Sequence, residues 1–239
     1  MGDEHMRRPM AAFAVLAVCA AALAGCGQHK SHRASSRTTT TTPTTTTAAP
    51  PLAEDALKGL LLNPEQINAV MGATEMKVTQ RHDTLSDDSA TMEPKECLAI
   101  DGAAQAQVYA GSGYSAMREQ TLRDGDESAH YVDQAVVLFP TAKQAAAFFD
   151  ASAKQWPACN EYTHTQSGSR WIPGPVANAD AVLSTVSMQE NAGGSAWAGC
   201  GRALAVRNNV IVDVNTCSAD PKDTAVVIAK QIAGKVPAG

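Results

Sequence analysis

Hydrophobic and polar positions divide this chain of 239 residues into three parts. Residues 10–24 carry no charge and are mostly apolar, whereas residues 27–51 are polar and rich in Thr and Pro. From residue 52 onward, apolar and polar positions follow the spacings of helices and strands, as a hydrophobic core requires. We therefore expect one folded domain at residues 52–239.

Three helices are expected in this domain. The segment from Asn63 to Gly72 has an N-cap residue, a Pro at the first helical position and a glycine stop. The segment from Thr141 to Pro157 begins with a capping box and continues with apolar residues at helical spacing. Asp220-Pro221-Lys222-Asp223 predicts the start of a third helix that runs nearly to the C-terminus.

Most other apolar segments are rich in β-branched residues or alternate with a period of two, which predicts strands. They lie at residues 76–80, 114–123, 130–139, 161–165, 181–188 and 196–216. No strand–helix–strand rhythm recurs along the chain. The predicted fold class is therefore α+β, a single domain with one twisted, mainly antiparallel sheet and helices packed on it.

A β-hairpin in the last of these segments predicts a disulfide. Residues 208–209 are both Asn, which tolerates the positive φ that a two-residue type I′ turn needs. In such a hairpin Arg207 faces Val210, so Cys200 and Cys217, each seven residues further out, face one another. A non-hydrogen-bonded pair has Cα atoms about 4.5 Å apart, which is within disulfide reach. The spacing predicts a Cys200–Cys217 bond.

The remaining cysteines then leave a single further pairing. Cys19 lies in the apolar leader and Cys26 in a lipidation signal described below, so Cys97 pairs with Cys159. The shorter disulfide loop contributes about 3 kcal/mol and the longer about 4 kcal/mol in the chain-entropy description. A redox or zinc role is the alternative, but the sequence contains no Cys-x-x-Cys spacing, which favours structural bonds in an oxidising compartment.

The same register sorts the hairpin into two faces. One face is small and apolar enough for a helix to lie on, and consists of Ala203, Ala205, Val212, Val214 and Thr216. The other face holds the disulfide with Arg202, Leu204, Asp213 and Asn215. This polar face is either solvated or the wall of a binding cleft, and its composition favours solvent.

The N-terminal residues predict export and attachment to a membrane. Arg7 and Arg8 precede an uncharged run shorter than the about 20 residues of a membrane-spanning helix, as in a secretory signal peptide. The run ends in Leu23-Ala24-Gly25-Cys26, which resembles a bacterial lipobox. We expect a signal peptide at residues 1–25, starting at Met1 or Met6, and lipidation of Cys26. Two or three acyl chains would hold the protein on the membrane.

Residues 26–51 are predicted to form a disordered tether, because a Thr- and Pro-rich segment has too few apolar residues to build a core. The tether is either bare or O-glycosylated. These predictions place the domain at the cell membrane, anchored by lipid and facing the extracytoplasmic side.

Charge argues against nucleic acid as a partner. The chain carries a net charge of −5 at pH 7, and residues 52–239 hold 22 acidic and 14 basic side chains, a net charge of −8. Neutralising phosphates requires clustered Lys and Arg instead.

A search for catalytic motifs finds none. Gly111-Ser112-Gly113 lacks the pattern of a nucleophile elbow, the sequence has no His-Glu-x-x-His, and no glycine-rich phosphate loop precedes a helix. His82, His130 and His164 have no motif partner nearby in the sequence, which favours surface or hydrogen-bonding roles. We expect no catalytic residue, cofactor or metal, although a hydrolase whose site is assembled from distant residues is an alternative.

Several segments carry a resemblance to a known family. They are Leu60 to Asn68 (LLLNPEQIN), Asp133 to Pro140 (DQAVVLFP), Trp156 to Cys159 (WPAC) and the hairpin from Cys200 to Cys217. Together with the four-cysteine framework they resemble the extracellular sensor domain of mycobacterial PknH-type serine/threonine protein kinases, and the stand-alone lipoproteins that carry this domain. The resemblance implies an α+β domain with two disulfides and a polar cleft for an unidentified ligand. Because a kinase catalytic loop and a spanning helix are missing, this chain is not expected to relay a signal across the membrane itself.

The function predicted from the sequence is therefore a lipid-anchored, sensor-like domain of the cell envelope that binds an extracellular small-molecule or cell-wall ligand. Gln134, Arg202, Asp213 and Asn215 are the candidate ligand-binding residues, since buried polar groups need partners that a ligand can supply. An envelope hydrolase is one alternative. A module that presents its acidic surface to an envelope protein is another.

Overall fold

A computed structural model describes residues 49–125 and 128–239. Its short 3₁₀ helices are η1 (Glu54–Gly59), η2 (Lys95–Cys97) and η3 (Trp156–Ala158). The α-helices are α1 (Pro64–Met71), α2 (Leu98–Asp101), α3 (Ala106–Tyr109), α4 (Ala142–Gln155) and α5 (Thr224–Gly234). The strands are β1 (Met76–His82), β2 (Met92–Glu93), β3 (Ala116–Asp124), β4 (Tyr131–Leu138), β5 (Tyr162–His164), β6 (Arg170–Pro173), β7 (Ala177–Ala179), β8 (Val182–Gln189), β9 (Gly199–Arg207) and β10 (Val210–Ser218).

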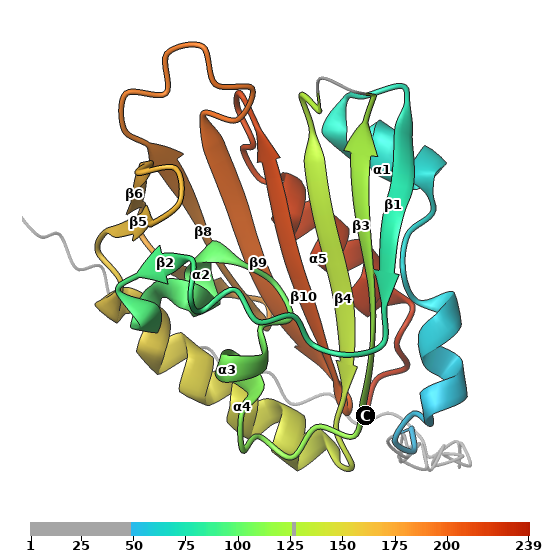
Figure 1. Ribbon diagram of the computed structural model, residues 1–239. Helices are drawn as coiled ribbons and strands as arrows, with labels where there is room; N and C mark the ends of the chain where they lie inside the picture. The colour runs from blue at the N-terminus through green and yellow to red at the C-terminus, as the bar shows by residue number, and fades with distance from the viewer. Residues whose placement is uncertain (1–48, 126–127) are drawn as a thin grey trace, which may run out of the picture. The chain divides into compact units, whose positions relative to one another are not determined.

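The strands form one antiparallel sheet of ten strands (Figure 1). Their order is β1-β3-β4-β10-β9-β8-β6-β5-β2, and β7 pairs with β8 outside this path. The β9–β10 hairpin lies in the middle, between β4 and β8, so its side chains are covered on both faces of the sheet. This architecture confirms the predicted α+β class with a mainly antiparallel sheet.

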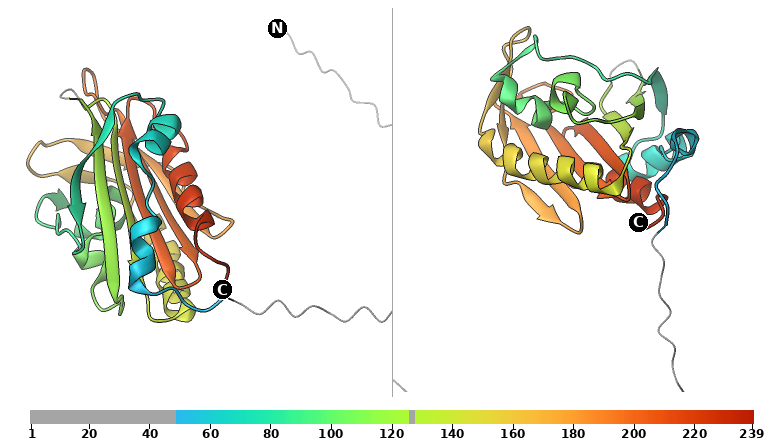
Figure 2. Two further views of the ribbon diagram at one scale, coloured as in Figure 1. Left: turned by 90° about the vertical axis from the view of Figure 1, so that its right-hand side faces the viewer. Right: turned by 90° about the horizontal axis from the view of Figure 1, so that it is seen from below.

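Helices cover both faces of the sheet (Figure 2). The first layer contains η1, α1 and α5, and the apolar face predicted for the hairpin packs on α5, where Val212 and Val214 meet Ile228 and Ile232. The second layer contains α2, α3 and α4 and packs on the opposite face, on residues such as Ile211. Because side chains alternate along a strand, the residues between Val212 and Cys217 that do not face α5 point into this second layer.

Capping explains why α1 has the predicted bounds. Asn63 Oδ1 accepts a hydrogen bond from Gln66 N at 2.9 Å, and Gln66 Oε1 accepts one from Asn63 N at 3.1 Å, which completes a capping box. Gly72 ends the helix with a φ of 69°, a conformation that glycine adopts without strain. The helix that begins after Thr141 is confirmed as α4.

The C-terminal helix begins later than the sequence predicts. Lys222 has a φ of 46°, so the chain still turns at a residue predicted to be helical, and α5 begins only at Thr224. The Thr224 hydroxyl donates a hydrogen bond to Pro221 O at 2.8 Å and accepts one from the Thr216 hydroxyl at 2.7 Å, which ties the start of the helix to β10.

The predicted hairpin register is confirmed. Arg207 pairs with Val210 and Cys200 pairs with Cys217, whose Cα atoms lie 4.1 Å apart across a disulfide. Cys97 and Cys159 form the second predicted disulfide. The predicted type I′ turn is wrong, because Asn208 alone of the two turn residues has a positive φ, 49°.

The reason lies in residue 209. Asn209 is buried, and its side-chain amide donates hydrogen bonds to Leu52 O at 3.0 Å and Phe139 O at 2.7 Å. These contacts fix the second turn residue to two other segments of the chain, so the local preference for a type I′ turn does not decide its conformation.

The first described residues lie beside the end of the chain, where Ala49 N donates a hydrogen bond to Ala238 O at 3.0 Å. Residues 49–51, placed in the tether by the sequence analysis, therefore contact the folded domain. The predicted signal peptide, Cys26 and the rest of the tether lie outside the described residues. In the described ranges, the structure contains no helix with the length and apolar character needed to cross a membrane.

Candidate functional site

A cleft of about 450 Å³ opens on the sheet face that carries Asp133 and Asn215. Its volume lies in the range of about 300–1,000 Å³ that small-molecule sites occupy. The floor is formed by side chains of the central strands, including the Cys200–Cys217 disulfide. Three walls surround the floor: the β3–β4 end of the sheet with the loop before β9, the β5–β6 hairpin, and the segment from residue 86 to residue 105.

Aromatic rings stand on two of these walls. Trp197, in the loop between β8 and β9, donates a hydrogen bond from Nε1 to Ser128 O at 2.6 Å. Its ring centroid lies 5.3 Å from that of Tyr131, and the Arg123 guanidinium carbon lies 5.2 Å from the Trp197 ring centroid. These contacts are typical of aromatic and cation–π packing and hold the Trp197 ring in place.

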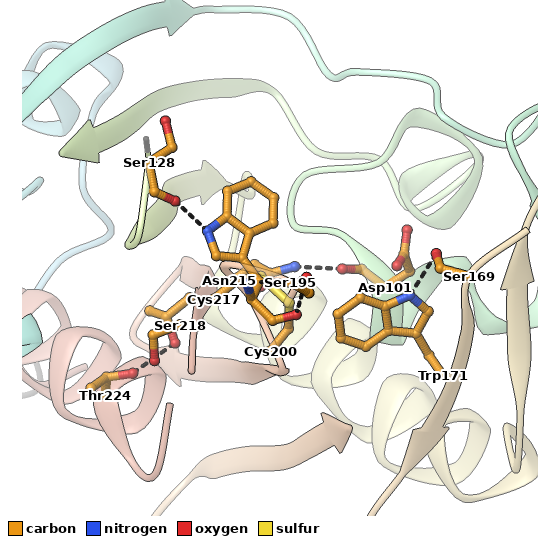
Figure 3. The surroundings of a disulfide bond; sticks show 12 residues. Asp101, Ser128, Ser169, Trp171, Ser195, Cys200, Asn215, Cys217, Ser218 and Thr224 are labelled. Carbon is orange, nitrogen blue, oxygen red and sulfur yellow. Dashed lines mark hydrogen bonds between the residues drawn. A yellow bond between two sulfur atoms is a disulfide. The ribbon is translucent and has the colours of Figure 1, made fainter. Parts of the chain in front are cut away.

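The second ring, Trp171, comes from β6 and donates a hydrogen bond from Nε1 to Ser169 Oγ at 3.1 Å. Figure 3 shows Trp171 and Ser128 on different sides of the Cys200–Cys217 disulfide. The cleft therefore has aromatic groups on two sides and sulfur atoms between them.

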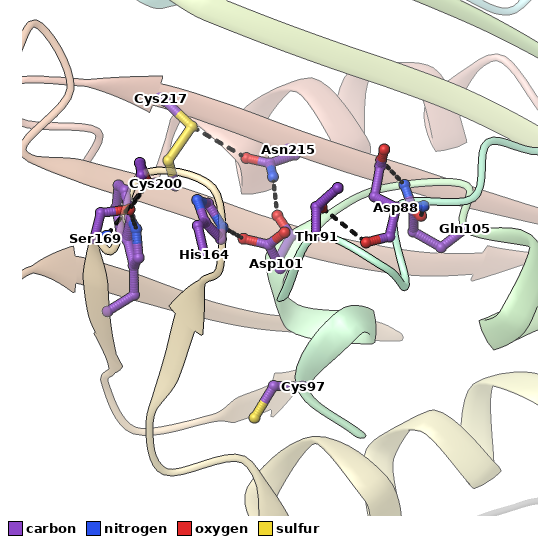
Figure 4. Close-up of polar contacts among 12 residues, drawn as sticks. Asp88, Thr91, Cys97, Asp101, Gln105, His164, Ser169, Cys200, Asn215 and Cys217 are labelled. Atoms are coloured by element: carbon purple, nitrogen blue, oxygen red, sulfur yellow. Dashed lines mark hydrogen bonds and ion pairs between the residues drawn. A yellow bond between two sulfur atoms is a disulfide. The ribbon is translucent and has the colours of Figure 1, made fainter. Parts of the chain in front are cut away.

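A chain of polar contacts runs from the floor to the β5 wall (Figure 4). The Asn215 amide donates a hydrogen bond to Asp101 O, and the Asp101 carboxylate lies 2.7 Å from His164 Nε2. Asn215 Oδ1 lies 3.5 Å from Cys217 Sγ, but a disulfide sulfur has no hydrogen to donate. That amide oxygen is therefore an acceptor without a donor among the described residues.

The ion pair raises the pKa of His164. The main cause is the hydrogen bond from His164 to Asp101, and the opposing effect of partial burial is smaller. At mildly acidic pH the imidazolium thus offsets the charge of Asp101 at the cleft wall.

The third wall is held by Gln105, which is buried. Gln105 Nε2 donates a hydrogen bond to Asp88 Oδ2 at 2.8 Å, and Gln105 Oε1 accepts one from Asp88 N at 2.9 Å. The Cys97–Cys159 disulfide links the same segment to the residue that follows η3. Both links hold the 86–105 segment over the sheet.

Two buried carboxyl groups lie at and next to the floor. Asp133 is 7% exposed and lines the cleft, and Glu119, on the same face of the neighbouring strand β3, is 3% exposed. Burial raises the pKa of both, and the pKa of Asp133 lies well above its usual range because Glu119 adds repulsion. As carboxylates, Asp133 Oδ1 and Glu119 Oε2 would lack donors, so a proton carried by Asp133 and donated to Glu119 satisfies both groups.

Arg202 and Asp213, predicted as ligand-binding residues, lie together but below the cleft. Arg202 Nη1 lies 2.5 Å from Asp213 Oδ1, and the two side chains are 3% and 2% exposed, so the expectation of a solvated face is wrong. Asp213 Oδ2 accepts hydrogen bonds from Ala104 N at 3.0 Å and from the Tyr109 hydroxyl at 2.9 Å. Arg202 Nη2 donates one to Gly102 O at 2.8 Å. Protein groups thus occupy most of the polar atoms for which a ligand was predicted.

This buried pair attaches the 102–109 segment to the centre of the sheet and so positions one wall of the cleft. Burial next to Asp213 also raises the pKa of Tyr109 well above its usual range, which keeps its hydroxyl a donor.

Gln134 lies on the opposite face of the sheet. It is fully buried, and its side-chain amide pairs with the backbone of Leu62, accepting from Leu62 N at 2.9 Å and donating to Leu62 O at 2.8 Å. Of the four predicted residues, only Asn215 has its side chain in the cleft; Gln134 instead fixes the chain entering α1 to the sheet.

Sequence reasoning missed the residues that give the cleft its character: Asp101, Arg123, Asp133, His164, Trp171 and Trp197. Once β4 is paired with β10, the alternation of side chains along β4 places Asp133, and not Gln134, on the face of the sheet that carries the cleft. Trp171 comes from a segment for which no strand was predicted, and Trp197 lies at the start of the predicted 196–216 segment, ahead of β9.

In the described part of the chain, no three His, Cys, Asp or Glu side chains are placed to hold a metal ion. The arrangement instead offers hydrogen-bonding groups and aromatic rings, which can bind a small molecule.

The fold and this cleft define a disulfide-bonded α+β domain with a preformed polar site. Its family is shown by comparison with known proteins: the chain belongs to the PknH-like extracellular domains, whose family model matches residues 52–235.

Relatives support the same assignment. Over 191 residues, 78% of this chain, it is 37% identical to the serine/threonine-protein kinases PknH of Mycobacterium bovis and of Mycobacterium tuberculosis. The match covers only 32% and 30% of the lengths of those two proteins. The crystal structure of the extracellular domain of PknH from Mycobacterium tuberculosis is similar with a TM-score of 0.73 at 36% identity, covering 78% of this chain and 97% of that one.

Proposed function

We propose that this protein is a lipid-anchored, sensor-like domain that faces the extracytoplasmic side of the cell membrane and binds an extracellular ligand in the cleft between Trp171 and Trp197. It acts by binding and has no catalytic activity of its own. Membership of a family of extracellular domains supports the location.

The observation that carries the binding role is the construction of the cleft. Its walls are fixed by a disulfide, by the buried Arg202–Asp213 pair and by the Gln105–Asp88 contacts, so the site exists before a ligand arrives. A preformed site loses little conformational entropy on binding. Asn215 Oδ1 at the floor has no donor among the described residues, and a ligand can supply one.

Native mass spectrometry of the full chain, recovered from envelope extract, tests this proposal. We expect a bound metabolite that Ser167→Trp displaces, because Ser167 is an exposed residue at the cleft. Gln166→Trp is the matched control, since Gln166 is exposed but does not line the cleft. No bound molecule, or one that both variants retain equally, would contradict a ligand-binding role for this cleft.

The lipid anchor is supported by the sequence Leu23-Ala24-Gly25-Cys26. We expect Cys26→Ser to abolish incorporation of radiolabelled palmitate and to move the protein out of the membrane fraction, or to leave its precursor uncleaved. Labelling that survives in the variant would refute lipidation at Cys26.

A further inference from the structure

The lining of the cleft has an unusual composition. Among the described residues that form it, none has an aliphatic side chain: all are polar or aromatic, apart from Gly102 and the Cys200–Cys217 disulfide. Small-molecule sites are more often lined by hydrophobic residues. An acyl chain or another aliphatic ligand would therefore find little matching surface here.

The charges in the lining nearly cancel. Asp88 and Asp101 are opposed by Arg123 and, at pH values below the raised pKa of His164, by its imidazolium. Burial and the nearby Glu119 raise the pKa of Asp133 well above its usual range, which favours the neutral form of Asp133. A charged ligand would therefore bring a charge for which the cleft has no free counter-charge. A neutral ligand with many hydroxyl groups leaves the balance unchanged.

The ring of Trp197 supplies a flat apolar surface. Trp197 is half-buried, and its packing against Tyr131 and Arg123 fixes the orientation of the ring while part of it stays accessible. The C–H groups on one face of a sugar ring form an apolar patch of similar size, which packs on such a ring. Rigid aromatic side chains provide contact area with little loss of conformational entropy.

The polar groups match hydroxyls better than ions. Asn215 presents an acceptor, and the side-chain amide of Gln189 both donates and accepts. The hydroxyls of Ser167 and Ser195 also line the cleft, where Ser167 bonds with Ser169 and Ser195 with Trp197. A sugar hydroxyl also donates and accepts, so several hydroxyls on one ring can satisfy this mixed set.

Together these features identify the class of ligand. We propose that the cleft binds a neutral saccharide, one ring of which stacks on Trp197 while its hydroxyl groups hydrogen bond with Asn215 and the surrounding polar residues. This inference rests on the proposed ligand-binding function and specifies its chemistry.

Glycan-array binding of the full chain tests the class, followed by calorimetric titration of each positive probe. The array carries neutral hexose, pentose and N-acetylhexosamine oligosaccharides. We expect at least one to bind, Trp197→Ala to weaken its binding by about tenfold or more, and Trp197→Phe to keep most of the affinity because the ring remains. Both variants lose the hydrogen bond from Trp197 to Ser128, but only Trp197→Phe keeps an aromatic ring. Comparing them therefore separates the stacking of the sugar on the ring from the anchoring of the loop. Tyr114→Ala, an exposed aromatic residue outside the cleft, is the control and should bind as wild type.

Absence of binding to every neutral glycan would overturn the saccharide assignment, and so would glycan binding that Trp197→Ala leaves unchanged. Palmitate and lysine are titrated in parallel. Binding of either one, displaced by Ser167→Trp, would overturn the saccharide class but keep the proposed ligand-binding function. Recovery of the chain from envelope extract without any bound molecule would contradict the broader function as well.

Discussion

Replacing Asp133 with Asn should change how the stability of the domain depends on pH. In wild type, Asp133 and Glu119 are 7% and 3% exposed. We expect them to share one proton, because burial and the neighbouring Glu119 raise the pKa of Asp133, and as two carboxylates they would lack donors. Asn at position 133 replaces the protonated carboxyl with a neutral amide of nearly the same shape, whose N–H can donate to Glu119.

The direction of the effect follows from the raised pKa of Asp133 in the folded state. Above the unfolded pKa of about 3.9, the folded protein holds a proton that the unfolded chain has released. The contribution of the Asp133 proton to wild-type stability is therefore fully present below about pH 3.9. Above this pH it decreases by about 1.4 kcal/mol per pH unit until the pH passes the folded pKa. Asp133→Asn removes this decrease, so the variant gains stability relative to wild type as pH rises.

Urea unfolding followed by tryptophan fluorescence between pH 4 and about pH 8 measures this difference. Asp150→Asn is the control, since Asp150 is exposed on α4 and should leave the slope with pH unchanged. If Asp133→Asn showed the same pH slope as wild type, or lost stability relative to it at high pH, the shared proton would be refuted.

Three further results are expected. Replacing Cys200 and Cys217 together with Ser should lower the free energy of unfolding by about 3 kcal/mol in urea titrations, and an unchanged midpoint would contradict a stabilising role for this bond. His164→Gln should destabilise the domain below about pH 6.5, where His164 is protonated and paired with Asp101, and the loss should vanish as pH rises through the raised folded pKa; a difference that does not vary with pH would argue against the ion pair. Gln134→Leu should cost about 2 kcal/mol or more, because Leu62 N and O lose their buried partners, while calorimetry should show unchanged ligand affinity.

Local signals in the sequence predicted the parts of the fold that local physics decides. The capping residues around α1 fixed its bounds, and the count of residues on either side of the 208–209 turn placed Cys200 opposite Cys217. Such features need only neighbouring residues, or a hairpin whose register follows from its turn. The turn type itself was wrong because Asn209 bonds with Leu52 and Phe139, which lie far away in the sequence.

The candidate site depended on pairings that the sequence does not specify. The face on which Gln134 lies follows from the register of β4 against β10, and the run Ala135 to Phe139 is apolar on both faces, so no alternation revealed it. The short strands β2 and β6, which belong to the walls of the cleft, carry too few residues for a periodic signal. Asp101 and His164 are 63 residues apart, and only the folded sheet brings them together.

Binding in the cleft can be tested most directly with the three tryptophan indoles. Trp171 and Trp197 line the cleft, whereas Trp156 is buried beneath Arg202, away from the lining. In ¹⁵N-labelled protein titrated with envelope extract, we predict that the indole N–H signals of Trp171 and Trp197 shift while that of Trp156 stays in place. Signals that remain unmoved, or a shift of Trp156 alone, would contradict ligand binding at this site.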